Sequence, residues 1–151
     1  MRSRGLIKAM DDLYSKIIEK YDLEEVDIRT YSPLTLAFVG DCVFDLVIRS
    51  ILAGNGNAPN GKLHTRKSAI VKASAQAEMI DALYDILTEE EEAVYKRGRN
   101  AHTGSKAKNA TETDYHKATG LEALIGYLYM QHRQERVLEL IKIGLEKTGM
   151  E

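Results

Sequence analysis

The sequence lacks features that several protein classes require. It has one cysteine, Cys42, which excludes an internal disulfide framework and a cysteine-based zinc cluster. It has only 2 prolines, so long helices can form. No window reaches the roughly 18 apolar residues of a membrane span, because Asp41 and Asp45 divide the longest candidate, residues 34–52. We therefore expect a cytoplasmic protein without a membrane span or a secretion signal.

The composition is typical of a soluble globular domain, with 44% apolar and 29% charged residues. A chain of 151 residues is long enough to bury its own hydrophobic core. The formal net charge of −2 does not by itself indicate a nucleic-acid binder. Affinity for phosphates depends on where the cations lie, so their distribution has to be considered.

Apolar residues recur at helical spacing along most of the chain, and no segment alternates with the period of a strand. Ser32 before Pro33 is a helix start, and Thr88 with Glu91 forms a capping box. We therefore predict an all-α protein. The expected helices cover about residues 6–21, 33–53, 62–87 (with room for a kink), 89–101, 114–131 and 135–147.

Several common catalytic arrangements are excluded. The 4 histidines include no pair spaced three or four apart, so no helix face presents two imidazoles to a metal. Residues 56–63 nearly match a phosphate-binding loop, but Leu63 stands where that motif needs a hydroxyl. Cys42 lies inside an apolar run, which gives no support to a nucleophilic triad.

Two acidic residues, Asp41 and Glu122, lie among apolar neighbours at helical spacing. Burying an ionised carboxylate is costly, so each acid must be paired, protonated or bound to a cation. Glycines close to them would let two helices approach and bring both acids to one Mg²⁺, which prefers carboxylate and water oxygens. The alternative is an ion pair with an arginine such as Arg49, or an exposed position. The glycines are Gly40, Gly120 and Gly126.

A basic segment, residues 93–111, contains no acid and follows directly after four glutamates, residues 89–92. Such segregation of charge predicts contacts with phosphates, with asparagines available for sugar or phosphate oxygens. The alternative is a solvated loop. The candidate binding residues are Lys96, Arg97, Arg99, Asn100, Lys106, Lys108 and Asn109.

The segments around both acids resemble the ribonuclease III family. Residues 38–46, FVGDCVFDL, are similar to the signature helix of that family, and residues 121–129, LEALIGYLY, to its second catalytic helix. Residues 75–78 and 88–101 are similar to the short Mini-ribonuclease III branch, which lacks the double-stranded RNA-binding domain. The resemblance extends from about residue 31 to residue 143.

The resemblance implies roles for individual residues. Asp41 and Glu122 correspond to the two metal-binding catalytic acids. Ala37 and Thr119 stand where longer ribonucleases III carry further carboxylates, a loss that the short branch shares. Asp45 matches an acidic position of the signature helix, so Asp45 and Thr119 are expected as supporting residues.

The resemblance also implies a helical, dimeric ribonuclease III-like endonuclease fold for residues 29–148, preceded by a helical extension and connector, residues 1–28. It implies a Mg²⁺-dependent endoribonuclease, with Mn²⁺ as a possible substitute. This enzyme would cleave double-stranded RNA to 5′-phosphate and 3′-hydroxyl ends, in maturation of the large-subunit (23S) ribosomal RNA precursor. The alternative is a non-catalytic RNA-binding or ribosome-associated scaffold that retains the fold, since Ala37 and Thr119 replace acids. A helix-turn-helix DNA-binding protein is less consistent with the sequence, because no basic recognition helix stands out.

Overall fold

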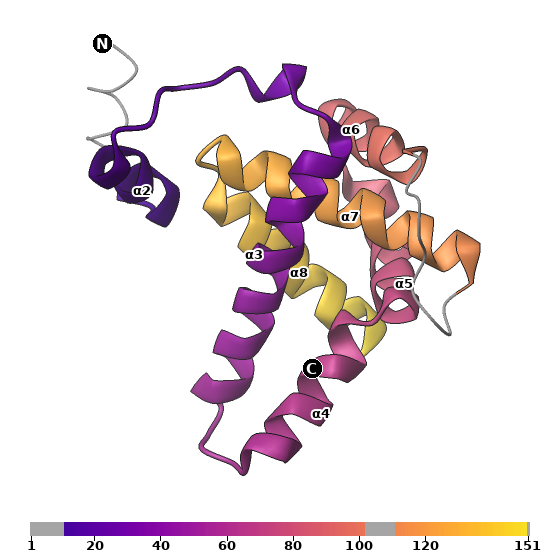
Figure 1. The fold of residues 1–151 in the computed structure, drawn as a ribbon. Helices are drawn as coiled ribbons and strands as arrows, with labels where there is room; N and C mark the ends of the chain where they lie inside the picture. The colour runs from indigo at the N-terminus through magenta and orange to yellow at the C-terminus, as the bar shows by residue number, and fades with distance from the viewer. Residues whose placement is uncertain (1–10, 102–110, 151) are drawn as a thin grey trace.

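The computed structural model describes residues 11–101 and 111–150, and the regular elements in this part of the chain are all helical (Figure 1). The prediction of an all-α protein is confirmed. None of the described helices combines the length and hydrophobicity that crossing a membrane needs. The helices are α2 (Leu13–Tyr21), α3 (Pro33–Gly54), α4 (Asn60–Val71), α5 (Ala73–Leu83), α6 (Glu89–Arg99), α7 (Glu112–Met130) and α8 (Gln134–Thr148), with short 3-10 turns at Ile28–Thr30 and Tyr84–Ile86.

Helix α7 lies at the centre of the fold. Each residue from Ala118 to Leu128 is buried except Glu122, which is partly exposed. Helices α3, α5, α6 and α8 pack around α7 (Figure 1), and their apolar side chains form one continuous core with it. A single acidic side chain therefore interrupts an otherwise buried stretch of helix.

Helix α3 begins and ends close to where the sequence predicts. The Ser32 side chain accepts a hydrogen bond from the Leu34 N–H, and Pro33 occupies the first helical turn. The helix continues for 22 residues to Gly54. In Figure 1 it crosses α7 and runs on beyond it, and α4 returns from its far end. Both the segment that carries Asp41 and the crossing with α7 thus lie on one uninterrupted helix.

The helix expected over residues 62–87, with room for a kink, is in fact two separate helices, α4 and α5. The chain is extended at Lys72, which separates α4 from α5. The reason lies in tertiary packing, because α4 buries only Ile70, whereas α5 buries most of one face against the core. The break turns α5 toward α7. The buried residues of α5 are Ala75, Gln76, Ala77, Met79, Ile80 and Leu83.

Helix α6 begins with the predicted capping box. The Thr88 hydroxyl accepts from the Glu91 N–H, and the Glu91 carboxylate accepts from the Thr88 N–H at 2.9 Å. The same carboxylate is fully buried and accepts from the Arg136 guanidinium at 2.7 Å. The cap therefore also ties α6 to α8.

Helix α2 packs on the turn between α7 and α8 through a polar contact. Ser15 Oγ lies 2.9 Å from His132 Nδ1, and the Tyr14 ring stacks on the His132 ring at 5.2 Å between centroids. His132 has a left-handed backbone, with φ 63°. Ile18 of α2 is also buried. The expected first part of this helix, residues 6–10, lies outside the described residues.

Candidate active site

The main chains of α3 and α7 touch where the two helices cross. A Cβ added to Gly40 would lie 1.7 Å from the backbone oxygen of Glu122. A Cβ added to Gly126 would lie 1.9 Å from the backbone oxygen of Leu36. No side chain fits at either point, so the close approach that the sequence predicts from Gly40 and Gly126 is confirmed.

Gly120 serves a different contact from the one expected. A Cβ at Gly120 would lie 2.6 Å from the Tyr95 ring, which belongs to α6 and not to α3. Gly98 on α6 is equally tight, since a Cβ there would lie 2.7 Å from the Ala123 Cβ. These glycines therefore bring α6 against the part of α7 that flanks Glu122.

The crossing brings the side chains of Asp41 and Glu122 close enough together that Asp41 raises the pKa of Glu122. The two acids lie 81 positions apart in the sequence, on α3 and α7. The sequence predicts both on apolar faces, but Asp41 is exposed, and only Glu122 is largely withdrawn from solvent. The expected burial of Asp41 is therefore wrong: its side chain lies at the edge of an open groove on α3.

Burial, followed by the repulsion of the Asp41 carboxylate and the hydrogen bond with it, raises the pKa of Glu122 to about 8. Two ionised carboxylates that lie close together repel each other, so Glu122 retains its proton near neutral pH. The pair therefore behaves as an acid site that a divalent cation could occupy in place of the proton.

The alternative, an arginine partner for these acids, does not hold within residues 11–101 and 111–150. Arg49 Nε donates to Asp45 Oδ2 at 2.7 Å, and Lys67 Nζ lies 3.9 Å from the other Asp45 oxygen. No ion pair in this part of the chain involves Asp41 or Glu122. The basic groups near α3 thus neutralise Asp45 and leave the Asp41–Glu122 pair uncompensated.

The chemistry of this donor set fits a hard divalent cation such as Mg²⁺, which binds through a few carboxylates and keeps several waters. Within the described residues, no group of three or more histidine, cysteine or acidic side chains is arranged to hold a metal. Water or substrate oxygens would have to supply the remaining coordination. The pair would therefore form an open cation site.

A further polar residue, Gln76, lies at this site and was not singled out from the sequence. Its side chain is 2% exposed and lies near enough to Glu122 to lower the pKa of that carboxyl. In the sequence, Gln76 stands out only as an amide between two small residues, Ala75 and Ala77. Which face of this helix turns toward α7 depends on the break at Lys72. Spacing alone could not identify it.

The expected supporting residues have other partners. The Asp45 carboxylate is occupied by the basic groups described above. Thr119 is buried, and its hydroxyl donates to the Tyr115 carbonyl oxygen at 3.0 Å within α7. Ala37, also buried, offers no ligand.

The candidate phosphate-binding residues fall into two groups. Those at the end of α6 are described: Lys96 pairs with Glu92 at 3.2 Å, and the Arg97 guanidinium donates to the Tyr31 carbonyl oxygen at 3.2 Å. The Arg99 guanidinium lies 5.7 Å from the centroid of the Tyr95 ring and donates from Nε to Asn100 Oδ1 at 3.3 Å. Lys106, Lys108 and Asn109 lie outside the described residues.

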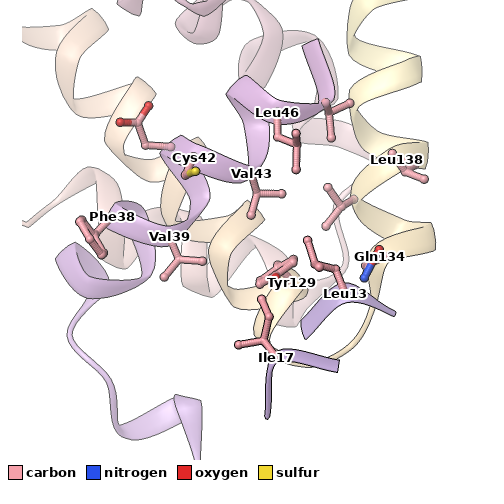
Figure 2. Close-up of a pocket in the computed structure, with 13 residues that line it drawn as sticks. Leu13, Ile17, Phe38, Val39, Cys42, Val43, Leu46, Tyr129, Gln134 and Leu138 are labelled. Atoms are coloured by element: carbon pink, nitrogen blue, oxygen red, sulfur yellow. The ribbon is translucent and has the colours of Figure 1, made fainter. Parts of the chain in front are cut away.

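An apolar groove of about 630 Å³ runs beside Asp41. Figure 2 shows side chains from α2, α3 and α8 converging on it, including Val43, Leu13 and Leu138. Phe38, at its edge, is 79% exposed, although it is a large apolar residue on the same helix as Asp41. The exposed face of α3 is therefore hydrophobic, unlike the surface expected of a free helix.

Comparison with known proteins places this site in a family. Residues 34–133 match the model of the ribonuclease III domain, a segment that contains both Asp41 and Glu122. A Mini-ribonuclease 3 from Enterococcus faecalis is 42% identical over 125 residues, covering 82% of this chain and 95% of its own. The chain belongs to the Mini-ribonuclease III branch of the ribonuclease III family. The Mini-ribonuclease 3 of Brevibacillus brevis is 45% identical over 116 residues, covering 77% of this chain and 87% of its own.

A solved structure shares the fold of this chain. The chain superposes on a crystal structure of a protein from Fusobacterium nucleatum with a TM-score of 0.72 and 33% sequence identity. The match covers 80% of this chain and 96% of that one. The expected ribonuclease III-like fold is thereby confirmed. Helix α2 lies outside the segment that matches the family model.

Proposed function

We propose that this member of the family is a metal-dependent endoribonuclease that hydrolyses double-stranded RNA, with Asp41 and Glu122 as its catalytic, metal-binding acids. The observation that carries the proposal is a pair of neighbouring carboxylates, one from each crossing helix, with no basic partner in an ion pair among the described residues. Their mutual repulsion disfavours the doubly ionised state, and a bound cation would favour it. The same pair falls within the segment that matches the family model.

The cation in this proposal is Mg²⁺, with Mn²⁺ as a substitute, because both accept oxygen ligands. When bound, such an ion activates water and neutralises charge that develops on a phosphate. The role of Asp41 and Glu122 is to fix the place of the ion against the RNA backbone. Asp45 and Thr119 act as supporting residues, by holding the basic groups beside α3 and the helical turn before Glu122. Hydrolysis leaves 5′-phosphate and 3′-hydroxyl ends.

RNA binding is assigned to the basic end of α6 and the residues that follow it. Gly98 packs on α7 beside Ala123, which places this end of α6 next to the helix turn that carries Glu122. Cations there would contact phosphates near the acid pair, so binding would depend steeply on salt. The residues are Lys96, Arg97, Arg99, Asn100, Lys106, Lys108 and Asn109. A-form RNA is contacted mainly through its phosphates and 2′-hydroxyls, so these residues would read shape and not sequence.

We infer that a second copy of the chain covers the apolar face of α3. The groove beside Asp41 and the exposed Phe38 form a hydrophobic surface on the helix that also carries the acid. A homodimer would bury this surface and place two acid pairs in one particle. The substrate that we propose is the precursor of large-subunit (23S) ribosomal RNA.

The decisive experiment compares the wild type with Asp41→Asn and Glu122→Gln on end-labelled duplex RNA, with Mg²⁺ and with EDTA. We expect wild-type fragments only with Mg²⁺, and a loss of at least about 100-fold in rate for each variant, because each removes half of the ion's protein ligands. Both variants retain side-chain volume, so circular dichroism should show folded protein. A Glu122→Gln protein that cleaves at the wild-type rate would refute the assignment.

The same assay tests the scaffold alternative. Retardation of duplex RNA without cleavage, in Mg²⁺ and in Mn²⁺, would favour an RNA-binding protein that keeps the fold without the chemistry. Duplex DNA as a competitor tests the proposed substrate class. If DNA competes as well as RNA, contacts with the 2′-hydroxyls do not contribute to binding.

A further inference from the structure

The imidazole of His132 is buried between two carboxylates, and its side chain is only 6% exposed. Nδ1 lies 3.3 and 3.2 Å from the two carboxylate oxygens of Asp12. Nε2 lies 3.8 Å from Glu25 Oε1 and has no hydrogen-bond partner among the described residues. Asp12 caps α2, and Glu25 belongs to the segment between α2 and α3. Both acids therefore precede the segment that matches the family model, whereas His132 lies within it.

Only the protonated imidazole suits both of these acidic neighbours. A neutral imidazole carries one N–H and one lone pair, so either tautomer leaves a lone pair facing a carboxylate. The imidazolium carries an N–H at both nitrogens, which lets it donate to Asp12 and attract Glu25. The Tyr14 ring stacks on the imidazole, and the electron-rich face of an aromatic ring favours a positive charge. Protonation of His132 should therefore strengthen the contacts that hold α2.

The other groups around this turn do not replace the missing positive charge. Arg133, the neighbouring cation, pairs with Glu90 of α6 at 3.1 Å. Burial opposes ionisation of Asp12, but hydrogen bonds with Ser15 and His132 hold the pKa of that carboxyl below its usual value of 3.8. Asp12 is thus ionised throughout the neutral range. The titratable and charged groups around the turn are Asp12 and Tyr14 of α2, Glu25 and Asp27 of the segment after it, Glu90 of α6, Tyr129 of α7, and Arg133.

The backbone of His132 indicates that the ring occupies this position at a conformational cost. Its φ is 63°, in the left-handed region that glycine usually fills where a helix ends. The Arg133 N–H donates to the Leu128 carbonyl oxygen at 2.9 Å, which closes the end of α7 around this residue. The contacts that the His132 ring makes with α2 help to offset that cost.

Helix α2 depends on being seated on this turn. It has 9 residues, and isolated helices of that length are marginal in water. Its buried side chains are Ser15 and Ile18. Two further side chains of α2, Leu13 and Ile17, line the apolar groove beside Asp41 (Figure 2). Release of α2 would therefore remove one wall of that groove.

We propose that His132 is a pH-dependent clasp for α2. Protonation of its ring seats α2 on the turn between α7 and α8, and loss of the proton loosens α2 and opens the groove wall that Leu13 and Ile17 form. Imidazoles change charge between pH 5 and 8, so the clasp responds in the physiological range. It acts independently of the proposed chemistry of the Asp41–Glu122 pair.

The test is hydrogen exchange of the full chain without RNA, followed by nuclear magnetic resonance at pH 5.5 and pH 8. Uptake of one proton can shift an equilibrium up to tenfold per pH unit, so we expect the protection factors of the α2 amides to be about 10-fold higher at pH 5.5. His132→Asn should abolish this difference, because asparagine tolerates a left-handed backbone and does not titrate. Equal protection at both pH values in the wild type, or an unchanged difference in His132→Asn, would overturn the proposal.

Two control variants separate the clasp from the effect of pH on the whole protein. His64→Asn replaces an exposed histidine of α4 and should leave the response of α2 unchanged. Glu122→Gln removes the carboxyl whose raised pKa should make global stability depend on pH, and the response of α2 should persist in this variant. If the response disappears in Glu122→Gln, it belongs to the acid pair and His132 is not a clasp.

A second measurement uses the wild type and does not depend on a folded variant. The chain has 4 histidines, so the ring signals of His132 can be followed separately in a pH titration by nuclear magnetic resonance. The α2 amide signals should shift with the same midpoint as the His132 ring. If the ring titrates and the α2 amides do not move, or if the ring does not titrate between pH 5 and 8, the proposal is wrong.

Discussion

Gly40 lies directly against the backbone carbonyl of Glu122, so closely that a Cβ at Gly40 would stand 1.7 Å from that oxygen. We predict that Gly40→Ala lowers the free energy of unfolding by about 3 kcal/mol, because the helices must separate at a backbone contact that cannot yield. The same separation would move Asp41 away from Glu122. Urea denaturation measures the first effect, and RNA cleavage at a temperature where the variant is folded measures the second.

The control for this prediction is Gly54→Ala at the end of the same helix. A Cβ there would meet no atom within 4 Å, so this variant should retain full stability and activity. A Gly40→Ala protein as stable as Gly54→Ala would show that the two helices do not touch at this point.

Glu122 should make the stability of the protein depend on pH. Its pKa is about 8 in the folded protein against an ordinary value of 4.5, so the folded state binds the proton more tightly than the unfolded state. The resulting stabilisation is fully present below pH 4.5 and is lost as the pH rises to about 8. In EDTA, Glu122→Gln should therefore be more stable than the wild type at pH 9, by about 3 kcal/mol.

Urea denaturation at pH 5, 7 and 9 checks this prediction. The advantage of Glu122→Gln should shrink as the pH falls. Glu78→Gln provides a control, because it removes one negative charge at an exposed position of α5. A difference between Glu122→Gln and the wild type that is constant across this range would contradict the predicted coupling to a proton.

The basic residues after Glu92 should control the salt dependence of RNA binding. Replacement of Arg97, Arg99, Lys106 and Lys108 by glutamine should weaken duplex RNA binding and flatten the plot of log affinity against log salt, by about 1 for each phosphate that the protein no longer neutralises. Fluorescence anisotropy over a salt series with an uncleavable duplex measures the slope. Lys142→Gln, at an exposed position of α8, should leave the slope unchanged. If the variant with all four substitutions has the same slope as the wild type, this segment does not bind phosphates.

Phe38 should contribute to association between copies of the chain. A Phe38→Glu substitution would place a charge on the apolar face of α3, and we expect a dimer to become a monomer of 16.9 kDa in sedimentation analysis. Tyr21→Glu is the matched control, since Tyr21 is an aromatic residue that is 72% exposed and lies away from the groove. A wild-type protein that is monomeric at high concentration would exclude the proposed homodimer.

Local features of the sequence predicted the parts of the fold that depend on nearby residues. Ser32 and Pro33 specify the start of α3, and Thr88 with Glu91 specifies the start of α6, because capping needs only a few consecutive residues. The close approach at Gly40 could be predicted for a similar reason. A glycine beside a functional acid on an apolar helix is best explained by a neighbouring backbone.

Contacts between distant segments could not be predicted in the same way. The break at Lys72 has no proline or glycine to mark it and arises because α5 buries its face against α7. The partner of Gly120 is Tyr95 on α6, which helix periodicity does not identify. Whether Asp41 is covered depends on which helices reach its side of α3, and the sequence neighbours of Asp41 carry no information about that.

The contact between the main chains of α3 and α7 also limits where this pair of acids could be engineered. Two carboxylates grafted onto an ordinary helix pair would be kept apart by the side chains between the helices. A designed host would need glycines at both points of contact, equivalent to Gly40 and Gly126, before the acids themselves were introduced. A design must therefore reproduce the close contact between the two main chains before it introduces the two acids.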